Sequence, residues 1–171
     1  MEAAPIVIFG GTFDPIHEGH ISAIRFALRT YPSCTLAPTT QNPWKAEAPT
    51  ELSLRIQMME LVLRAEGLPE ASSPDLPGIS IENFRYQFAK DLVLHLHGQY
   101  PQRKLLWLVG ADTSSSVKKW RDWESLHVGL VVAPITINIH AIDIRAGGAQ
   151  IHPAIRNFIA SHGLYGAKLP S

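Results

Sequence analysis

The chain has 171 residues, 46% of them hydrophobic and 8% aromatic, which is enough to bury the core of one domain spanning residues 1–171. Fifteen basic residues balance fifteen acidic ones, so the overall charge excludes strong, non-specific attraction to nucleic acid or to an anionic membrane. One cysteine, Cys34, excludes an internal disulfide, and the chain shows neither a basic leader nor an apolar run of membrane-spanning length, so we expect a cytoplasmic protein.

Short β-rich runs alternate with amphipathic helical patterns along the chain. Strands are expected at residues 6–9, 34–37, 79–81, 105–109 and 130–133, the first ending at Gly10 and Gly11. Helices are expected at residues 19–30, 50–66, around 88–96 and from 153 to 162, with Thr50 as one N-cap. The alternation predicts an α/β fold with a single doubly wound, mostly parallel sheet and helices on both faces. Ligands of such folds collect at the carboxyl ends of the strands.

The segment GGTFDPIHEGH, residues 10–20, joins the first expected strand to the first expected helix. Glycines at a strand end let a ligand approach the backbone, and the N–H groups of the turn and helix start favour phosphate. His17 and His20 are three residues apart, so both can project from one face of the first helical turn and donate to phosphate oxygens. Two alternatives are a zinc-binding pair, for which further ligands at suitable spacing are missing, and two surface histidines without a ligand.

This segment resembles the signature of the HxGH nucleotidyltransferase superfamily, and its FDPxHxGH form is most similar to the bacterial nicotinate-nucleotide adenylyltransferase family. Three more segments resemble that family: NPWK at 42–45, LWLVGADTSSSVKKWRDW at 106–123 and FIASHGLYG at 158–166. The resemblance implies a Rossmann-like nucleotidyltransferase fold with a tryptophan-containing helix after the GAD turn. It also implies adenylyl transfer from ATP, carried with Mg²⁺, to nicotinate mononucleotide, which forms deamido-NAD and pyrophosphate in NAD biosynthesis.

The resemblance assigns roles to residues of these segments. His17 and His20 would hold the triphosphate and stabilise the transition state. The other residues expected at ATP or its phosphates are Gly10, Gly11, Thr12, Phe13, Lys45, Gly110, Asp112 and Arg145. Trp44 and Trp120 are expected at the nicotinate nucleotide, whereas Trp123 is expected to pack in the core. Lys45 as a solvated lysine, Trp44 as a loop anchor and Asp112 as a helix cap remain alternatives.

The chain departs from the family near its C-terminus. IHAIDIR, residues 139–145, stands where the family has isoleucine-serine-serine-threonine-x-isoleucine-arginine, so Ala141 and Ile142 cannot supply hydroxyl donors and His140 replaces a serine imperfectly. Losing one hydrogen bond to a charged group costs roughly 1.5–3 kcal/mol. Two hypotheses follow: a compact enzyme with fewer substrate contacts, or a catalytically weakened nucleotide-binding or regulatory module of the same fold.

Other acceptors are a further alternative. Pantetheine-phosphate adenylyltransferases generally have threonine at the position of His17, and cytidylyltransferases lack the NPxK loop, so both fit less well. The sequence does not distinguish nicotinate from nicotinamide mononucleotide, and it leaves homo-oligomerisation open.

Overall fold

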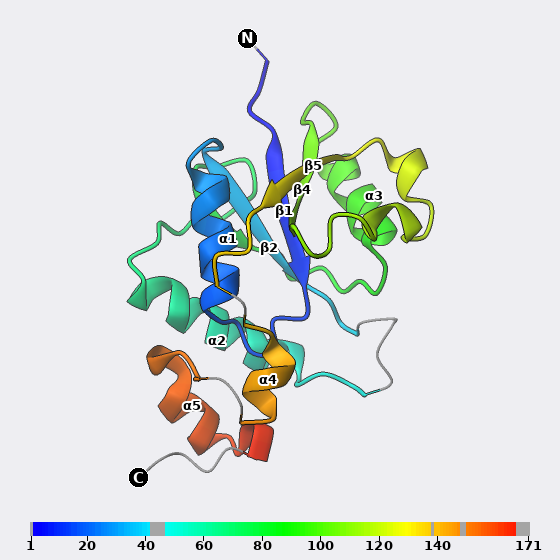
Figure 1. Ribbon diagram of the computed structural model, residues 1–171. Helices are drawn as coiled ribbons and strands as arrows, with labels where there is room; N and C mark the ends of the chain where they lie inside the picture. The colour runs from blue at the N-terminus through cyan, green and yellow to red at the C-terminus, as the bar shows by residue number, and fades with distance from the viewer. Residues whose placement is uncertain (1, 42–46, 138, 148–149, 167–171) are drawn as a thin grey trace.

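The computed structural model describes residues 2–41, 47–137, 139–147 and 150–166. Five strands form one sheet in the order β3-β2-β1-β4-β5 (Figure 1). Their bounds are β1 (Ile6–Gly11), β2 (Ser33–Pro38), β3 (Gly78–Ile81), β4 (Leu105–Gly110) and β5 (Gly129–Ala133). Every pair of neighbouring strands is parallel, so the carboxyl ends of all five lie at the same edge of the sheet. The predicted α/β fold with a parallel sheet is confirmed.

Helices cover both faces of the sheet, as Figure 1 shows for α1 and α3. Their bounds are α1 (Glu18–Leu28), α2 (Leu52–Ala65), α3 (Ala89–Gln99), α4 (Ala141–Arg145) and α5 (Arg156–Ser161), with 3-10 turns η1 (Val117–Lys119), η2 (Trp123–Leu126), η3 (Pro153–Ile155) and η4 (Leu164–Gly166). Successive residues of a strand face opposite sides of a sheet. In β1, Val7 therefore packs in one apolar cluster with α1 and α2, and Ile6 and Ile8 pack in a second cluster with α3.

Three predicted boundaries need correction. β1 continues through Gly10 and Gly11, because these residues pair with Ala37 and Pro38 of β2. The N-cap of α2 is Glu51 rather than Thr50, and its side chain makes no capping hydrogen bond. The helix expected around Trp120 is replaced by η1 and η2, which are separated by Asp122 in the left-handed conformation (φ 56°).

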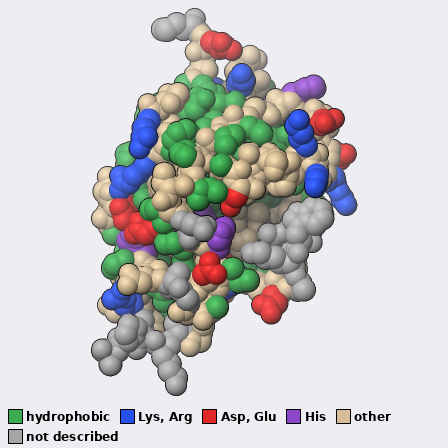
Figure 2. All heavy atoms as spheres, viewed as in Figure 1, with side chains coloured by type: hydrophobic (Ala, Val, Ile, Leu, Met, Phe, Trp, Pro, Cys, Tyr) green, Lys and Arg blue, Asp and Glu red, His purple; other side chains and the backbone are tan. Residues whose placement is uncertain are grey.

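Within the described ranges, no helix is long and apolar enough to cross a membrane. Acidic and basic side chains are interspersed on the face shown in Figure 2, in line with the balanced composition. The single cysteine, Cys34, is buried in β2.

Candidate active site

His17 and His20 form a stacked pair at the start of α1. Their ring centroids are 3.7 Å apart and their planes differ by 23°. His17 is the N-cap, and its Nδ1 accepts a hydrogen bond from the backbone N–H of Gly19 at 3.1 Å. The backbone N–H of His17 donates to Nδ1 of His20, also at 3.1 Å. Because each Nδ1 accepts, each neutral ring carries its proton on Nε2, which leaves both Nε2–H groups to bind a ligand.

Burial keeps this pair uncharged near neutral pH. His17 is only 6% exposed, and its burial, together with the nearby His140, lowers its pKa from 6.5 to about 4. The ring of His20 lies 4.7 Å from that of Phe13 and 5.8 Å from that of Phe9 between centroids. Burial, with smaller contributions from the other two histidines, lowers the pKa of His20 well below its ordinary value. The pair therefore offers an anion directional N–H donors rather than positive charges.

The glycine between the two histidines is required by packing. A Cβ atom on Gly19 would lie 2.9 Å from Cε1 and 3.0 Å from Nδ1 of His17. The ring could avoid it only by giving up the hydrogen bond from the Gly19 N–H. Gly10 is constrained in the same way, since a Cβ there would lie 2.3 Å from Cζ2 of Trp107. The glycines of this segment thus allow a close approach of aromatic rings as well as of a ligand.

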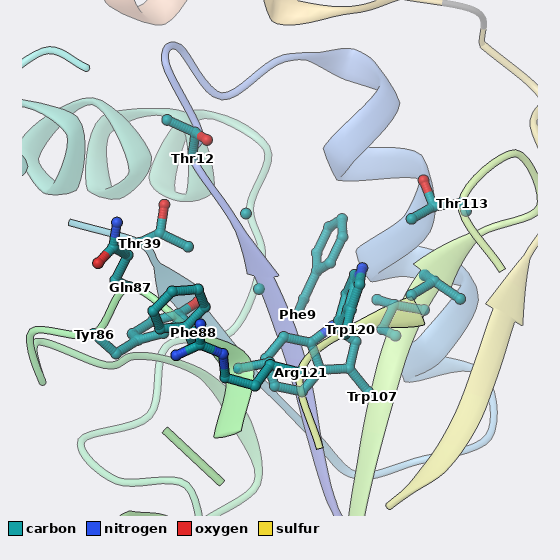
Figure 3. Close-up of a pocket in the computed structure, with 16 residues that line it drawn as sticks. Phe9, Thr12, Thr39, Tyr86, Gln87, Phe88, Trp107, Thr113, Trp120 and Arg121 are labelled. Atoms are coloured by element: carbon teal, nitrogen blue, oxygen red, sulfur yellow. The ribbon is translucent and has the colours of Figure 1, made fainter. Parts of the chain in front are cut away.

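Two cavities meet at the carboxyl ends of β1 and β4. The histidine cavity, of about 420 Å³, is lined by His17, His20 and His140 and by residues 133–137, 139, 141 and 142 at and after the end of β5. The aromatic cavity, of about 320 Å³, is lined by the rings of Phe9, Tyr86, Phe88, Trp107 and Trp120 (Figure 3). The two cavities share one wall, made by Phe9, Gly10, Thr12, Gly110 and Thr113. Two ligands bound in them would therefore come together at this wall.

Most of the predicted site residues within the described ranges line these cavities. Those in the histidine cavity are Gly10, Thr12, Phe13, His17, His20, Gly110 and Asp112. Gly11 and Trp120 line the aromatic cavity. Trp44 and Lys45 lie outside the described residues. Trp123 packs edge-on against Trp107 and Trp120 in the core, as expected.

Arg145 and Asp112 are placed differently from the other predicted residues. Arg145 lines neither cavity, because its Nη1 donates to the backbone carbonyl of Asp14 at 2.6 Å. Asp112 is exposed at the histidine cavity and does not cap the next helical turn, whose N-cap is Ser116. The capping alternative for Asp112 is therefore wrong, and its carboxylate is available to a ligand.

The hydroxyl groups missing from residues 139–145 have counterparts elsewhere in the histidine cavity. Thr12, Ser22, Thr113 and Thr136 all line it, and the hydroxyls of Ser22 and Thr136 lie 2.6 Å apart. Sequence comparison within one motif misses these side chains because they come from four separate segments.

Arg55 is a buried residue that the sequence analysis missed. It is 1% exposed, and its guanidinium donates to the carbonyls of Thr50 (2.6 Å), Thr12 (2.7 Å) and Thr39 (2.8 Å). Burial lowers its pKa, and the nearby Asp14 opposes this effect. Arg55 thus ties the turn after β1 to the end of β2 and the start of α2. The sequence did contain a signal that Arg55 is buried: it lies three residues after Leu52 and four before Met59, on the same face of α2 as these apolar residues.

Among the described residues, three possible metal ligands lie close together outside the histidine pair. Oxygens of Glu18 and Glu66 lie 3.5 Å and 2.7 Å from Nε2 of His152, and all three could reach one metal ion. However, Nδ1 of His152 accepts from the N–H of Ala154, so the neutral ring carries its proton on Nε2, and Glu66 is already paired with Arg25 at 2.7 Å. This cluster joins α1, α2 and η3 and lies outside both cavities.

Comparison with known proteins places these features in a family. Residues 8–161 match the family model described as cytidylyltransferase-like. The chain is 30% identical over 135 residues to a probable nicotinate-nucleotide adenylyltransferase of Ruegeria pomeroyi, a match that covers 75% of this chain and 60% of the relative. It is 29% identical over 198 aligned positions to the protein of the same name from Neisseria meningitidis, and this match covers 94% of this chain and 98% of the relative.

The chain spans about three fifths of the length of the first curated relatives that it matches. Among solved structures, the nicotinic acid mononucleotide adenylyltransferase of Plasmodium falciparum complexed with NaAD superposes with a TM-score of 0.74 and 16% identity, covering 98% of this chain and all of that one. At this identity the likeness shows the shared fold.

Proposed function

The chain belongs to the cytidylyltransferase-like family, and we propose that within it the protein acts as a nicotinate-nucleotide adenylyltransferase. It would transfer the adenylyl group of ATP to the phosphate of nicotinate mononucleotide and so form deamido-NAD and pyrophosphate in NAD biosynthesis. The names of the curated relatives support this choice of substrates. A cytoplasmic location would suit the reaction and the single, buried cysteine.

The observation that carries the proposal is the wall shared by the two cavities. An adenylyl transfer needs two nucleotides with their phosphates in contact and their bases apart. The histidine cavity would hold the triphosphate, and the aromatic cavity would hold the pyridine ring of the acceptor. Binding both across Gly10 and Gly110 would bring the acceptor phosphate to the α-phosphorus and make the reaction effectively unimolecular.

The proposed chemistry needs no covalent protein intermediate. An oxygen of the acceptor phosphate attacks the α-phosphorus of ATP, the bond to the β-phosphate oxygen breaks, and pyrophosphate leaves. The Nε2–H groups of His17 and His20 would donate to phosphate oxygens on which negative charge grows. Mg²⁺ would enter with the triphosphate as part of the substrate. Asp112 is the one carboxylate among the described residues that line the histidine cavity.

The altered stretch at residues 139–145 keeps a second candidate open, a nucleotide-binding module with weakened catalysis. In this stretch, His140 is the N-cap of α4 but its side chain makes no capping hydrogen bond, and Ile142 is 61% exposed. The threonine hydroxyls of the histidine cavity favour the enzyme, because they supply donors that residues 139–145 lack.

The deciding experiment incubates the purified chain with Mg²⁺, ATP and nicotinate mononucleotide and measures deamido-NAD by chromatography and released pyrophosphate by a coupled assay. We expect both products in equal amounts. His20→Asn should lower kcat by about 100-fold or more, since the asparagine oxygen can still accept from the His17 N–H but the variant lacks the Nε2–H donor. His97→Ala, on the partly exposed side of α3, is the matched control and should keep full activity. ATP binding without product at excess protein would favour the module instead.

A further inference from the structure

The aromatic cavity contains one charged side chain among the described residues that line it. Its walls are aromatic, aliphatic, glycine, threonine and glutamine residues, and the exception is Arg121. A single cation beside several aromatic rings suits a flat aromatic ligand that bears a negative charge.

Arg121 is an exposed residue that packs against an aromatic ring and is not paired with a carboxylate among the described residues. Its guanidinium carbon lies 4.3 Å from the ring centroid of Phe88, and the side chain runs from beside Trp120 toward Phe88 in Figure 3. The adjacent carboxylate, Asp122, is bound by Lys90 at 2.6 Å. Over the described ranges, no carboxylate forms an ion pair with Arg121. Stacking on Phe88 leaves the edge of the guanidinium, with its N–H donors, open to an anion.

Arg121 lines a part of the aromatic cavity that the histidine cavity does not share. Phe88, Trp120 and Arg121 line the aromatic cavity but not the histidine cavity. Gly10, Thr12 and the other shared residues line both. The acceptor phosphate has to face the shared wall in order to reach the α-phosphorus. The ring end of the acceptor then faces Phe88, Trp120 and Arg121.

We infer that Arg121 is the residue by which this protein selects an acceptor whose pyridine ring carries a carboxylate over one that carries a carboxamide. The inference rests on the proposed function and names the acceptor preference of the same site. A carboxylate accepts two hydrogen bonds from the guanidinium and neutralises it. A carboxamide is neutral and offers one oxygen, so it leaves the arginine charge uncompensated.

The experiment compares nicotinate and nicotinamide mononucleotides with the full chain, its Arg121→Gln and Arg121→Lys variants, and Arg85→Gln. Arg85 is an exposed arginine close in sequence to Phe88 that lines neither cavity, so it controls for a general loss of positive charge. Dissociation constants come from quenching of tryptophan fluorescence, since Trp107 and Trp120 border the cavity, and kcat/KM comes from dinucleotide formation. Arg121→Gln should weaken binding and lower kcat/KM for the nicotinate compound by about 10- to 100-fold. Values for the nicotinamide compound should change less than about threefold, and Arg121→Lys should keep part of the preference.

An equal loss for both acceptors would overturn the inference, because Arg121 would then hold the common phosphate or the cavity wall. Unchanged values for both acceptors would also overturn it, as would an equal shift in preference for Arg85→Gln. The binding measurement separates the inference from the proposed function. Binding that depends on Arg121 without dinucleotide formation would support the inference and refute the enzyme, and a chain that binds neither acceptor would refute both.

Discussion

Acidification is expected to lower the free energy of unfolding through His17. Burial lowers the pKa of this ring to about 4 in the folded protein from an ordinary value of 6.5. Between these values the unfolded chain binds a proton that the folded chain does not, so stability falls as the pH falls. For these two pKa values, linkage gives a loss of about 2 kcal/mol between pH 7.5 and pH 5, and of about 3 kcal/mol below pH 4.

Urea unfolding at pH 7.5 and pH 5 measures this loss for the natural chain and for His17→Asn. The asparagine oxygen can accept from the Gly19 N–H as Nδ1 of His17 does, but it does not titrate. His20 is present in both proteins and its lowered pKa comes mainly from its own burial, so the difference in their pH dependence comes chiefly from His17. We expect the natural chain to lose about 2 kcal/mol more than the variant over this interval. Parallel losses would refute the lowered pKa of His17 and so its neutral state near pH 7, and so would a His17 imidazole signal that titrates near 6.5 in the NMR spectrum.

Two further substitutions test the packing around the site. Gly19→Ala should lower kcat/KM by about tenfold or more while hardly changing the melting temperature, because the added methyl group displaces the His17 ring. The control is Gly98→Ala in α3, where an added Cβ meets nothing within 4 Å, and it should leave activity unchanged. Arg55→Met should lower the free energy of unfolding in urea by about 3 kcal/mol or more, because three carbonyls lose their donor, whereas Arg64→Met on the exposed side of α2 should stay within about 1 kcal/mol. Retained activity in Gly19→Ala, or equal losses for the two arginine variants, would contradict this view of the site.

The strands were predictable because each is a short β-rich run between polar or glycine-rich segments, even where, as in β5, only alternate residues are buried. β4 illustrates this, since residues 105–109 are all buried and the prediction differs from the structure by one residue. The region around Trp120 was not predictable in the same way. Its helical pattern is interrupted by Asp122 in the left-handed conformation, which local sequence preferences do not reveal for a non-glycine residue.

The site was predictable as far as its residues follow one another in the sequence. GGTFDPIHEGH placed His17 and His20 together because the start of a helix fixes residues three apart on one face. Arg55 was missed because its partners, Thr12 and Thr39, belong to other strand ends and meet it only after the sheet has formed. The contribution of Thr136 to the histidine cavity was missed for the same reason, because it depends on the sheet order, in which β5 lies two strands from β1.

The described lining of the histidine cavity contains neither lysine nor arginine, and its two central imidazoles are neutral near pH 7. If this cavity holds the triphosphate of ATP, as proposed, the lining would do so by the direction of its N–H and O–H donors rather than by net charge. Direction is what an in-line displacement needs, because it fixes the α-phosphorus between the attacking and leaving oxygens. A strongly cationic cavity would also attract free pyrophosphate and slow its release. Under the proposed function, the neutral donors that burial of His17 and His20 produces would align ATP without retaining the product.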